Sequence, residues 1–354
     1  MDKKQKKWLI LSIAISVTVL FVVLFFTVDI NTLTELKNCN IWFILLAILM
    51  HIVSICFWAN RIQIMSWSLG YKVPFLHTVN LVCSNQFVAS VTPSQVGGEP
   101  VRIYELTKAN VPVADATAIV LMERVFDAIV LAVGALAGAV MLNIFFSSID
   151  VPQIYLSLSY IAVAVFLAVV VLFIFMAKIP SFGRKVVLGG AGFFLKKKSA
   201  EKRTEILSSL SEQVDRFYAA LNHFLGRSKT GFFLGLFFSA LFWVNEFLLV
   251  SVLMMGLGLE PNFVLTFIFM ILITVILMIP ITPGGAGVAE ISMGGFFSLI
   301  VPKSMVGILV LLWRLIIYYF NLLTGFIATL IILRREAKDE NVKQKEYHDN
   351  NRTA

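Results

Sequence analysis

The chain has 354 residues, of which 59% are apolar and 14% are charged, and its formal net charge is +8. A soluble domain carries about 25% charged residues, so this composition excludes a soluble protein and predicts an integral membrane protein. Three cysteines without a paired spacing and four scattered histidines indicate no disulfide framework and no metal site. We therefore expect no metal or other cofactor, and no nucleic-acid partner.

Apolar runs of roughly 20 residues predict membrane-spanning helices. The first run, Trp8–Val28, is longer than the apolar core of a signal peptide, so we interpret it as a retained helix. Segments 74–105 and 262–302 carry glycine and proline and are predicted to be broken. The predicted fold class is all-α, with about six spanning helices at 8–28, 41–59, 112–141, 154–177, 230–257 and 305–333.

Lysine and arginine are distributed unevenly between the two sides of this predicted topology. With the N-terminus inside, the inner segments hold 25 basic residues and the outer loops hold only Lys37 and Lys303. Because positively charged loops stay on the cytoplasmic side, we expect a multi-pass protein of the cell membrane with both termini in the cytoplasm.

The two broken segments contain similar motifs. Thr92–Glu99 and Thr282–Glu290 both read Thr-Pro, three residues, Gly, and then a glutamate. Arg124 lies 31 residues after Pro93 (124 − 93), and Arg314 lies 31 residues after Pro283 (314 − 283). This order indicates an internal duplication, with one broken segment in each half.

The residues that precede each motif extend the similarity. Phe57-Trp58-Ala59-Asn60 precedes the first copy and Phe242-Trp243-Val244-Asn245 precedes the second. In the predicted topology the two copies run in opposite directions, so the halves, about 41–141 and 230–333, form an inverted repeat. In transporters a broken segment at matching positions of two repeats is typical of a substrate site.

Proline and glycine explain why these segments are broken. Pro93 removes a backbone donor, and Gly97 and Gly98 permit unusual dihedral angles. Irregular backbone at membrane depth is tolerated only within protein or beside a wet cavity, so we predict re-entrant segments whose restarting helices point N–H groups at an anion. The alternatives are a plain turn at the membrane surface, or full spans that raise the helix count to ten.

Several charged residues fall within the predicted helices or motifs. Each charge at mid-bilayer costs about 2.5–3.5 kcal/mol, so such residues normally face a bundle interior. The alternative to a functional role is a structural ion pair, for example Glu123 with Arg314. The charged residues are Glu99, Glu123, Arg124, Asp127, Glu246, Glu290 and Arg314.

Uncharged polar residues in these helices have simpler interpretations. Asn60, Asn245 and Asn321 are interpreted as interhelical hydrogen-bond donors and acceptors, and His51 as a structural rather than a catalytic residue. The Gly-x-x-x-Gly at 134–138 predicts a close-packing helix face.

The domain organisation is predicted to be simple. Residues 1–335 form a single membrane domain, in which segment 178–229 includes an amphipathic cytoplasmic helix. Its lysines either contact anionic lipid or only enforce the topology. Residues 336–354 are polar and charged and are predicted to be a disordered cytoplasmic tail.

These motifs together resemble a known family, the membrane domain of the lysylphosphatidylglycerol synthases, which is also called flippase-like. The resemblance covers about residues 8–335, and nothing after Leu333 is long enough for the aminoacyl-transferase domain of the full-length synthases. It implies movement of a phospholipid between leaflets rather than enzymatic synthesis. The resemblance is carried by Asn85-Gln86-Phe87, Thr92-Pro93 to Glu99-Pro100, Arg102, Glu123-Arg124-x-x-Asp127 and Pro283 to Glu290.

We expect a lipid translocator whose substrate is a phospholipid or a polyprenyl-phosphate-linked lipid. The alternatives are an accessory subunit of a separate lipid-modifying enzyme or glycosyltransferase, and an enzyme acting on a lipid-linked phosphate. No ATP-binding motif is found, and the oligomeric state is open. The predicted substrate-binding residues are Thr92, Pro93, Gln95, Gly97, Gly98, Glu99, Arg102, Glu123, Arg124, Asp127, Pro283, Gly284, Gly285, Gly287, Glu290 and Arg314.

Overall fold

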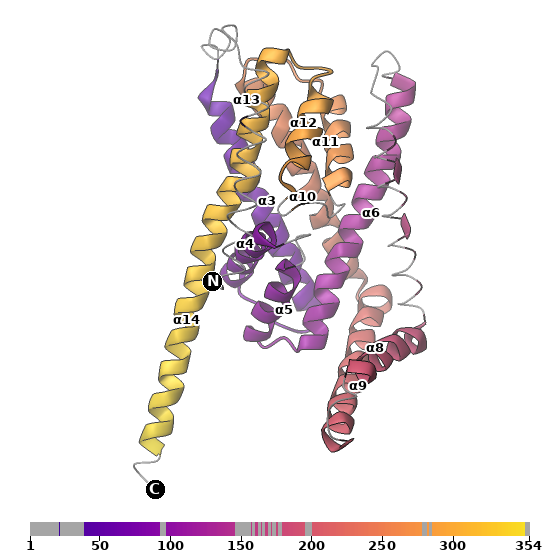
Figure 1. Ribbon diagram of the computed structural model, residues 1–354, viewed down its shortest axis with the longest axis vertical. Coiled ribbons are helices and arrows are strands. Elements are labelled where there is room, and N and C mark those ends of the chain that lie inside the picture. Colours follow the sequence, from indigo (N-terminus) through magenta and orange to yellow (C-terminus); the bar gives the residue numbers. More distant parts are fainter. Residues whose placement is uncertain are drawn as a thin grey trace.

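Figure 1 shows the computed structural model, which describes residues 39–92, 97–145, 179–194, 200–277, 282 and 285–350 and a few isolated positions elsewhere. Every element within these ranges is helical. The elements are α3 (Ile41–Ser68), α4 (Phe75–Val91), α5 (Gly98–Lys108), α6 (Val113–Phe145), α8 (Pro180–Phe194), α9 (Ala200–Asn222), η4 (His223–Arg227), α10 (Lys229–Gly256), α11 (Phe263–Leu277), α12 (Val288–Phe297), α13 (Lys303–Arg314), η6 (Leu315–Tyr319) and α14 (Phe320–Asn350).

Three described helices are long and apolar enough to cross a membrane. They are α3, α10 and the continuous run Lys303–Arg335, and α11 and α12 are shorter apolar helices. Large apolar side chains such as Trp42, Phe237 and Leu323 are exposed on these long helices. An exposed apolar surface of this kind is expected for a protein solvated by lipid.

The four predicted helices that fall within the described residues are found with altered ends. The helix predicted at 41–59 continues as α3 to Ser68, where Gly70, with φ +91°, ends the helical conformation. The predicted spans 8–28 and 154–177 lie outside the described residues, apart from isolated positions. Segment 336–350, predicted to be disordered, continues α14 as a helix because Glu, Lys, Gln and Ala are good helix formers.

Two hydrophobic clusters hold the helices together. One is built mainly on α10, α11, α12 and α13, and the other mainly on α3, α4, α5, α6 and α9. The prediction of a close-packing face at Gly134 and Gly138 is confirmed, because a Cβ there would approach Ile271 and Ile268 of α11 to 3.0 and 3.1 Å. The central pair is α3 and α10, which lie side by side through the middle of the molecule (Figure 1).

Candidate functional site

Three arginines and three carboxylates form a closed ring of alternating charge. Their side chains come from three helices, α3, α5 and α6, of which α6 packs against both of the others. The N–O distances extend from 2.5 Å, between Asp127 and Arg61, to 3.9 Å, between Arg124 and Asp127. In order, the ring runs Arg61, Glu123, Arg102, Glu99, Arg124, Asp127 and back to Arg61.

The ring is buried on one side and open on the other. The side chains of Arg61, Arg102 and Glu123 are at most 2% exposed. Arg124 and Glu99, by contrast, are 43% and 31% exposed and are joined by a 2.7 Å ion pair. A ligand can therefore compete for the Arg124–Glu99 pair without entering the buried part of the ring.

Two tryptophans from different helices complete the buried part of the ring. The indole N–H of Trp58 on α3 donates to Glu123 at 2.8 Å, and that of Trp243 on α10 donates to Asp127 at 3.0 Å. Arg61 also donates to the hydroxyl of Ser239 on α10 at 2.7 Å. Because buried charges are costly unless their hydrogen bonds are satisfied, these contacts stabilise the ionised carboxylates.

A second ion pair lies in the other hydrophobic cluster. Arg314 donates from Nε to Glu290 at 2.8 Å, and Glu290 also accepts the backbone N–H of Gly287 at 2.8 Å. The Arg314 guanidinium lies 4.6 Å from the ring centroid of Tyr318. Its Nη2 atom is buried and has no hydrogen-bond partner among the described residues. This pair thus holds an unsatisfied donor.

The first motif segment breaks the helix as predicted. Helix α4 ends at Val91, and α5 begins at Gly98. The hydroxyl of Thr92 donates to the carbonyl of Val88 and accepts the N–H of Gly97 at 3.1 Å. A Cβ at Gly98 would overlap the side-chain oxygen of Asn85, so the close approach of α5 to α4 requires glycine there.

The second motif segment uses positive φ angles instead. Gly285 and Gly287 have φ +66° and +85°, values that favour glycine. The hydroxyl of Thr282 donates to the Ala286 carbonyl at 2.8 Å. At the start of each restarting helix one backbone N–H is already bonded within the chain, that of Gly97 to Thr92 and that of Gly287 to Glu290. The predicted contact between an anion and the N–H groups of these helix starts stays a prediction. Pro93, Gln95, Pro283 and Gly284 lie outside the described residues.

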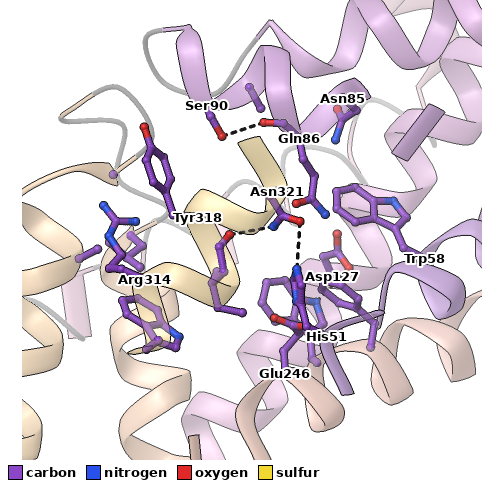
Figure 2. Close-up of a pocket in the computed structure, with 18 of the residues that line it drawn as sticks. His51, Trp58, Asn85, Gln86, Ser90, Asp127, Glu246, Arg314, Tyr318 and Asn321 are labelled. Carbon is purple, nitrogen blue, oxygen red and sulfur yellow. Dashed lines mark hydrogen bonds and ion pairs between the residues drawn. The ribbon is translucent and has the colours of Figure 1, made fainter. Parts of the chain in front are cut away.

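A cavity of about 270 Å³, lined by polar, charged and apolar side chains, connects the ring with the second ion pair (Figure 2). It is lined by Arg61, Arg124 and Asp127 of the ring and by Arg314 of the second pair. Polar side chains of α4 and α14 line it as well, among them Asn85, Gln86, Ser90 and Asn321. The cavity therefore receives side chains from elements of both hydrophobic clusters.

Sequence reasoning located most of this site but assigned some partners wrongly. The suggested pairing of Glu123 with Arg314 is wrong, because Glu123 binds Arg61 and Arg102 while Arg314 binds Glu290. Glu99, Arg102, Glu123, Arg124 and Asp127 are brought together in the ring. Thr92, Gly97, Gly98, Gly285 and Gly287 shape the two breaks rather than line the ring.

The main omission is Arg61, because the helix predicted at 41–59 ends two residues before it and leaves it among the inner basic residues. The helical run without glycine or proline continues until Gly70, so the sequence already indicated that Arg61 is helical. Asn245 confirms the predicted interhelical role by donating to the carbonyl of Met50. Asn60 does not, since its side-chain amide donates to the carbonyl of Cys56 in its own helix.

The fold and this charged cavity define a multi-pass helical membrane protein with an internal polar site. Residues 9–325 match the family described as the lysylphosphatidylglycerol synthase TM region, and the chain belongs to that family.

Similar proteins occur in several archaea. A UPF0104 membrane protein of Archaeoglobus fulgidus is 28% identical over 326 residues, which are 90% of this chain and 95% of that protein. A UPF0104 membrane protein of Pyrococcus horikoshii is 25% identical, covering 92% of this chain and 97% of its own. One of Methanocaldococcus jannaschii is 27% identical, covering 84% and 87%. These matches agree with a membrane location.

Proposed function

We propose that this protein moves a phosphate-bearing lipid between the two leaflets of the membrane. The proposal rests on one observation: the cavity is lined by two arginines that still have N–H donors available for a ligand. Arg124 is 43% exposed, and Arg314 has an unsatisfied Nη2. Guanidinium groups bind phosphate oxygens through several donors at once, so a lipid phosphate is the group this pair fits.

The cavity size supports a headgroup rather than a whole lipid. Its volume of about 270 Å³ is near the lower limit of small-molecule sites, about 300 Å³. Acyl chains would then remain outside, along exposed apolar residues such as Phe237 and Leu323. A headgroup in the cavity would displace Glu99 from Arg124, and Glu99 would keep its contact with Arg102.

The inverted repeat is part of the proposal, and matching contacts support it. In both halves the glutamate of the motif pairs with the arginine that lies 31 residues after the motif proline, Glu99 with Arg124 at 2.7 Å and Glu290 with Arg314 at 2.8 Å. In Figure 1, α4 and α5 lie near the middle of the molecule, below α11 and α12 in the upper part. Rocking of the two halves about the cavity would expose it alternately to each side.

We also propose a cell-membrane location with both termini in the cytoplasm and about six spanning helices. Removing the buried Arg61 and Arg102 from the 25 inner basic residues leaves 23 against two outer ones, so the bias persists. The proposed role is transport rather than catalysis. The lining hydroxyl of Ser90 donates to the backbone carbonyl of Gln86 and not to a base that could activate it as a nucleophile.

The test is transbilayer movement of labelled lipids in vesicles that contain the purified protein. Headgroup-labelled phospholipids and polyprenyl phosphates would be compared for the wild type, Arg124→Ala and the control Arg216→Ala, which removes an exposed arginine of α9. Movement of one lipid class that falls about tenfold or more in Arg124→Ala alone would support the proposal. Absence of movement of either class with intact protein would contradict it and favour an accessory role beside a separate lipid-modifying enzyme.

A further inference from the structure

A third polar cluster lines the same cavity and takes no part in the ion pairs described above. His51 of α3 contacts Glu246 of α10 through Nδ1 and Oε1 at 2.9 Å (Figure 2). Its Nε2 contacts the side-chain oxygen of Asn321 of α14 at 3.0 Å. The His51 and Glu246 side chains are only 3% and 11% exposed. The cluster joins three helices at a buried point.

The hydrogen bonds of Asn321 fix one histidine proton. The amide nitrogen of Asn321 donates to the backbone carbonyl of Ile317 at 2.8 Å, and a carbonyl can only accept. The amide oxygen must therefore face His51. Because that oxygen is also only an acceptor, Nε2 of His51 carries a hydrogen and donates it.

The contact on the other side of the imidazole then requires a second proton. With Nε2 protonated, Nδ1 of a neutral His51 is an acceptor, and so is an ionised Glu246. Two acceptors at 2.9 Å repel each other, so one proton must lie between them. It resides either on His51, giving imidazolium with carboxylate, or on Glu246, giving imidazole with carboxylic acid. Both arrangements are neutral overall.

Because the other charges around the cavity are balanced, the proton of this dyad sets the net charge of the cavity. The ionisable groups that line it besides the dyad are Arg61, Arg124, Asp127, Arg314 and Tyr318. The α4 side contributes only uncharged lining side chains, such as Asn85 and Gln86.

The ring and the second pair together hold four guanidiniums and four carboxylates, so their formal charges cancel. Among the described groups of these clusters, the net charge is thus zero with the dyad proton and −1 without it. An anion is attracted far less to the second state than to the first.

We infer that His51 and Glu246 form a proton-binding site whose occupancy is coupled to binding of a lipid phosphate in the cavity. This inference rests on the proposed function for its phosphate ligand. By linkage, an anion in the cavity strengthens proton binding, and the dyad proton strengthens anion binding by the same factor. A phosphate monoanion and a proton then cross together, with the two charges compensating each other.

Glu246→Gln provides a mimic of the protonated state. The amide that this substitution introduces donates to Nδ1 of neutral His51, while Nε2 still donates to Asn321, so the hydrogen bonds persist without an exchangeable proton. The matched control is Glu260→Gln, in the exposed loop that follows the same helix. Difference titration of the purified proteins in micelles between about pH 5 and 9 counts the protons released, over the range in which histidine sites normally titrate.

In this titration, Glu246→Gln should release one proton fewer than the wild type, and Glu260→Gln the same number. Equal release from Glu246→Gln and wild type would overturn the inference, whether or not the protein transports lipid. If Glu246→Gln does not fold, proton uptake by the wild type on lipid binding tests the inference instead. Adding a short-chain phosphatidylglycerol should cause proton uptake that a phosphatidylcholine analogue does not, and absence of uptake on measured binding would contradict the coupling.

Transport in vesicles separates the two proposals. Wild-type movement of an anionic lipid should fall about tenfold or more from the acidic to the alkaline end of this range, a size usual for coupling between sites. Glu246→Gln should vary by less than about twofold, because its cavity charge no longer changes. Movement with the same pH profile in both proteins would retain the translocator and reject the proton site. Absence of lipid movement together with the one-proton difference in the titration would retain the proton site and reject the translocator.

Discussion

The two glutamate–arginine pairs have nearly equal lengths but very different surroundings. Glu99 and Arg124 are 31% and 43% exposed, and both contact further members of the ring. Glu290 and Arg314 are 0% and 4% exposed, and Glu290 is also bonded to the backbone of Gly287. The same residue types at matching sequence positions therefore give one accessible pair and one enclosed pair.

This difference separates what each pair contributes. When Arg124 leaves Glu99, the carboxylate keeps Arg102 and some water, so the cost is small. When Arg314 is removed, Glu290 is left as a buried charge, which typically costs 3–5 kcal/mol. The accessible pair is suited to exchange partners with a ligand, and the enclosed pair is suited to hold the start of α12 against α13.

The largest expected effect is in the buried part of the ring. Arg61→Met removes the cation shared by Glu123 and Asp127 and leaves two buried carboxylates without it. We expect a loss of about 3–5 kcal/mol in the free energy of unfolding, measured by chemical denaturation in micelles. Arg216→Ala on the surface of α9 is the control and should change it by less than about 0.5 kcal/mol. A loss under about 1 kcal/mol for Arg61→Met would show that the ring is not a unit.

The second prediction compares the two glutamates directly. Glu290→Gln keeps the shape of the side chain but leaves the Arg314 cation without its counter-charge in a buried place. A loss of about 2–4 kcal/mol is expected for Glu290→Gln, against about 1 kcal/mol or less for the half-exposed Glu99→Gln. The same denaturation experiment measures both. Equal losses would remove the distinction between an accessible and an enclosed pair.

The residues of the ring show how far the sequence could be interpreted. Charged residues in apolar helices and the two glycine motifs were enough to predict a buried polar site and a helical membrane fold. Which arginine binds which carboxylate depends on how α3, α5 and α6 are rotated and on their distance from each other. No local pattern encodes that rotation, and the suggested Glu123–Arg314 pair was wrong for this reason.

His51 and Glu246 illustrate the same limit in a different way. They are 195 residues apart in the sequence, and neither lies in a motif. An isolated histidine in an apolar helix is read as structural, and only its two hydrogen-bond partners reveal that a proton is needed. Arg61, by contrast, was predictable, because no helix-breaking residue occurs before Gly70.

The third prediction tests the close packing of α5 against α4 at the first break. Gly98→Ala introduces a Cβ that overlaps the side chain of Asn85, so α5 must move away from α4. We expect a loss of about 1–3 kcal/mol, as for other overpacked sites. The control is Gly294→Ala inside α12, where a Cβ meets nothing within 4 Å and helix propensity predicts a gain of about 0.5–1 kcal/mol. Similar effects of the two substitutions would mean that α5 does not approach α4 this closely.

The smallest expected effect concerns the hydrogen bond between Tyr71 and Asp115, which lies outside the cavity and serves as a reference for the two ion pairs. Burial and the hydrogen bond to Asp115 raise the pKa of Tyr71 to about 12 from the ordinary 10.0. Because the folded pKa is the higher one, the contact stabilises the protein fully below pH 10 and is lost as the pH rises towards 12. Tyr71→Phe should therefore be less stable than the wild type by about 0.5–1.5 kcal/mol near neutral pH. This difference should shrink in unfolding experiments above about pH 10. If the difference in the free energy of unfolding between wild type and Tyr71→Phe stays constant up to pH 12, ionisation of the Tyr71 phenol does not control it. The losses measured for the two ion pairs would then need a different reference contact.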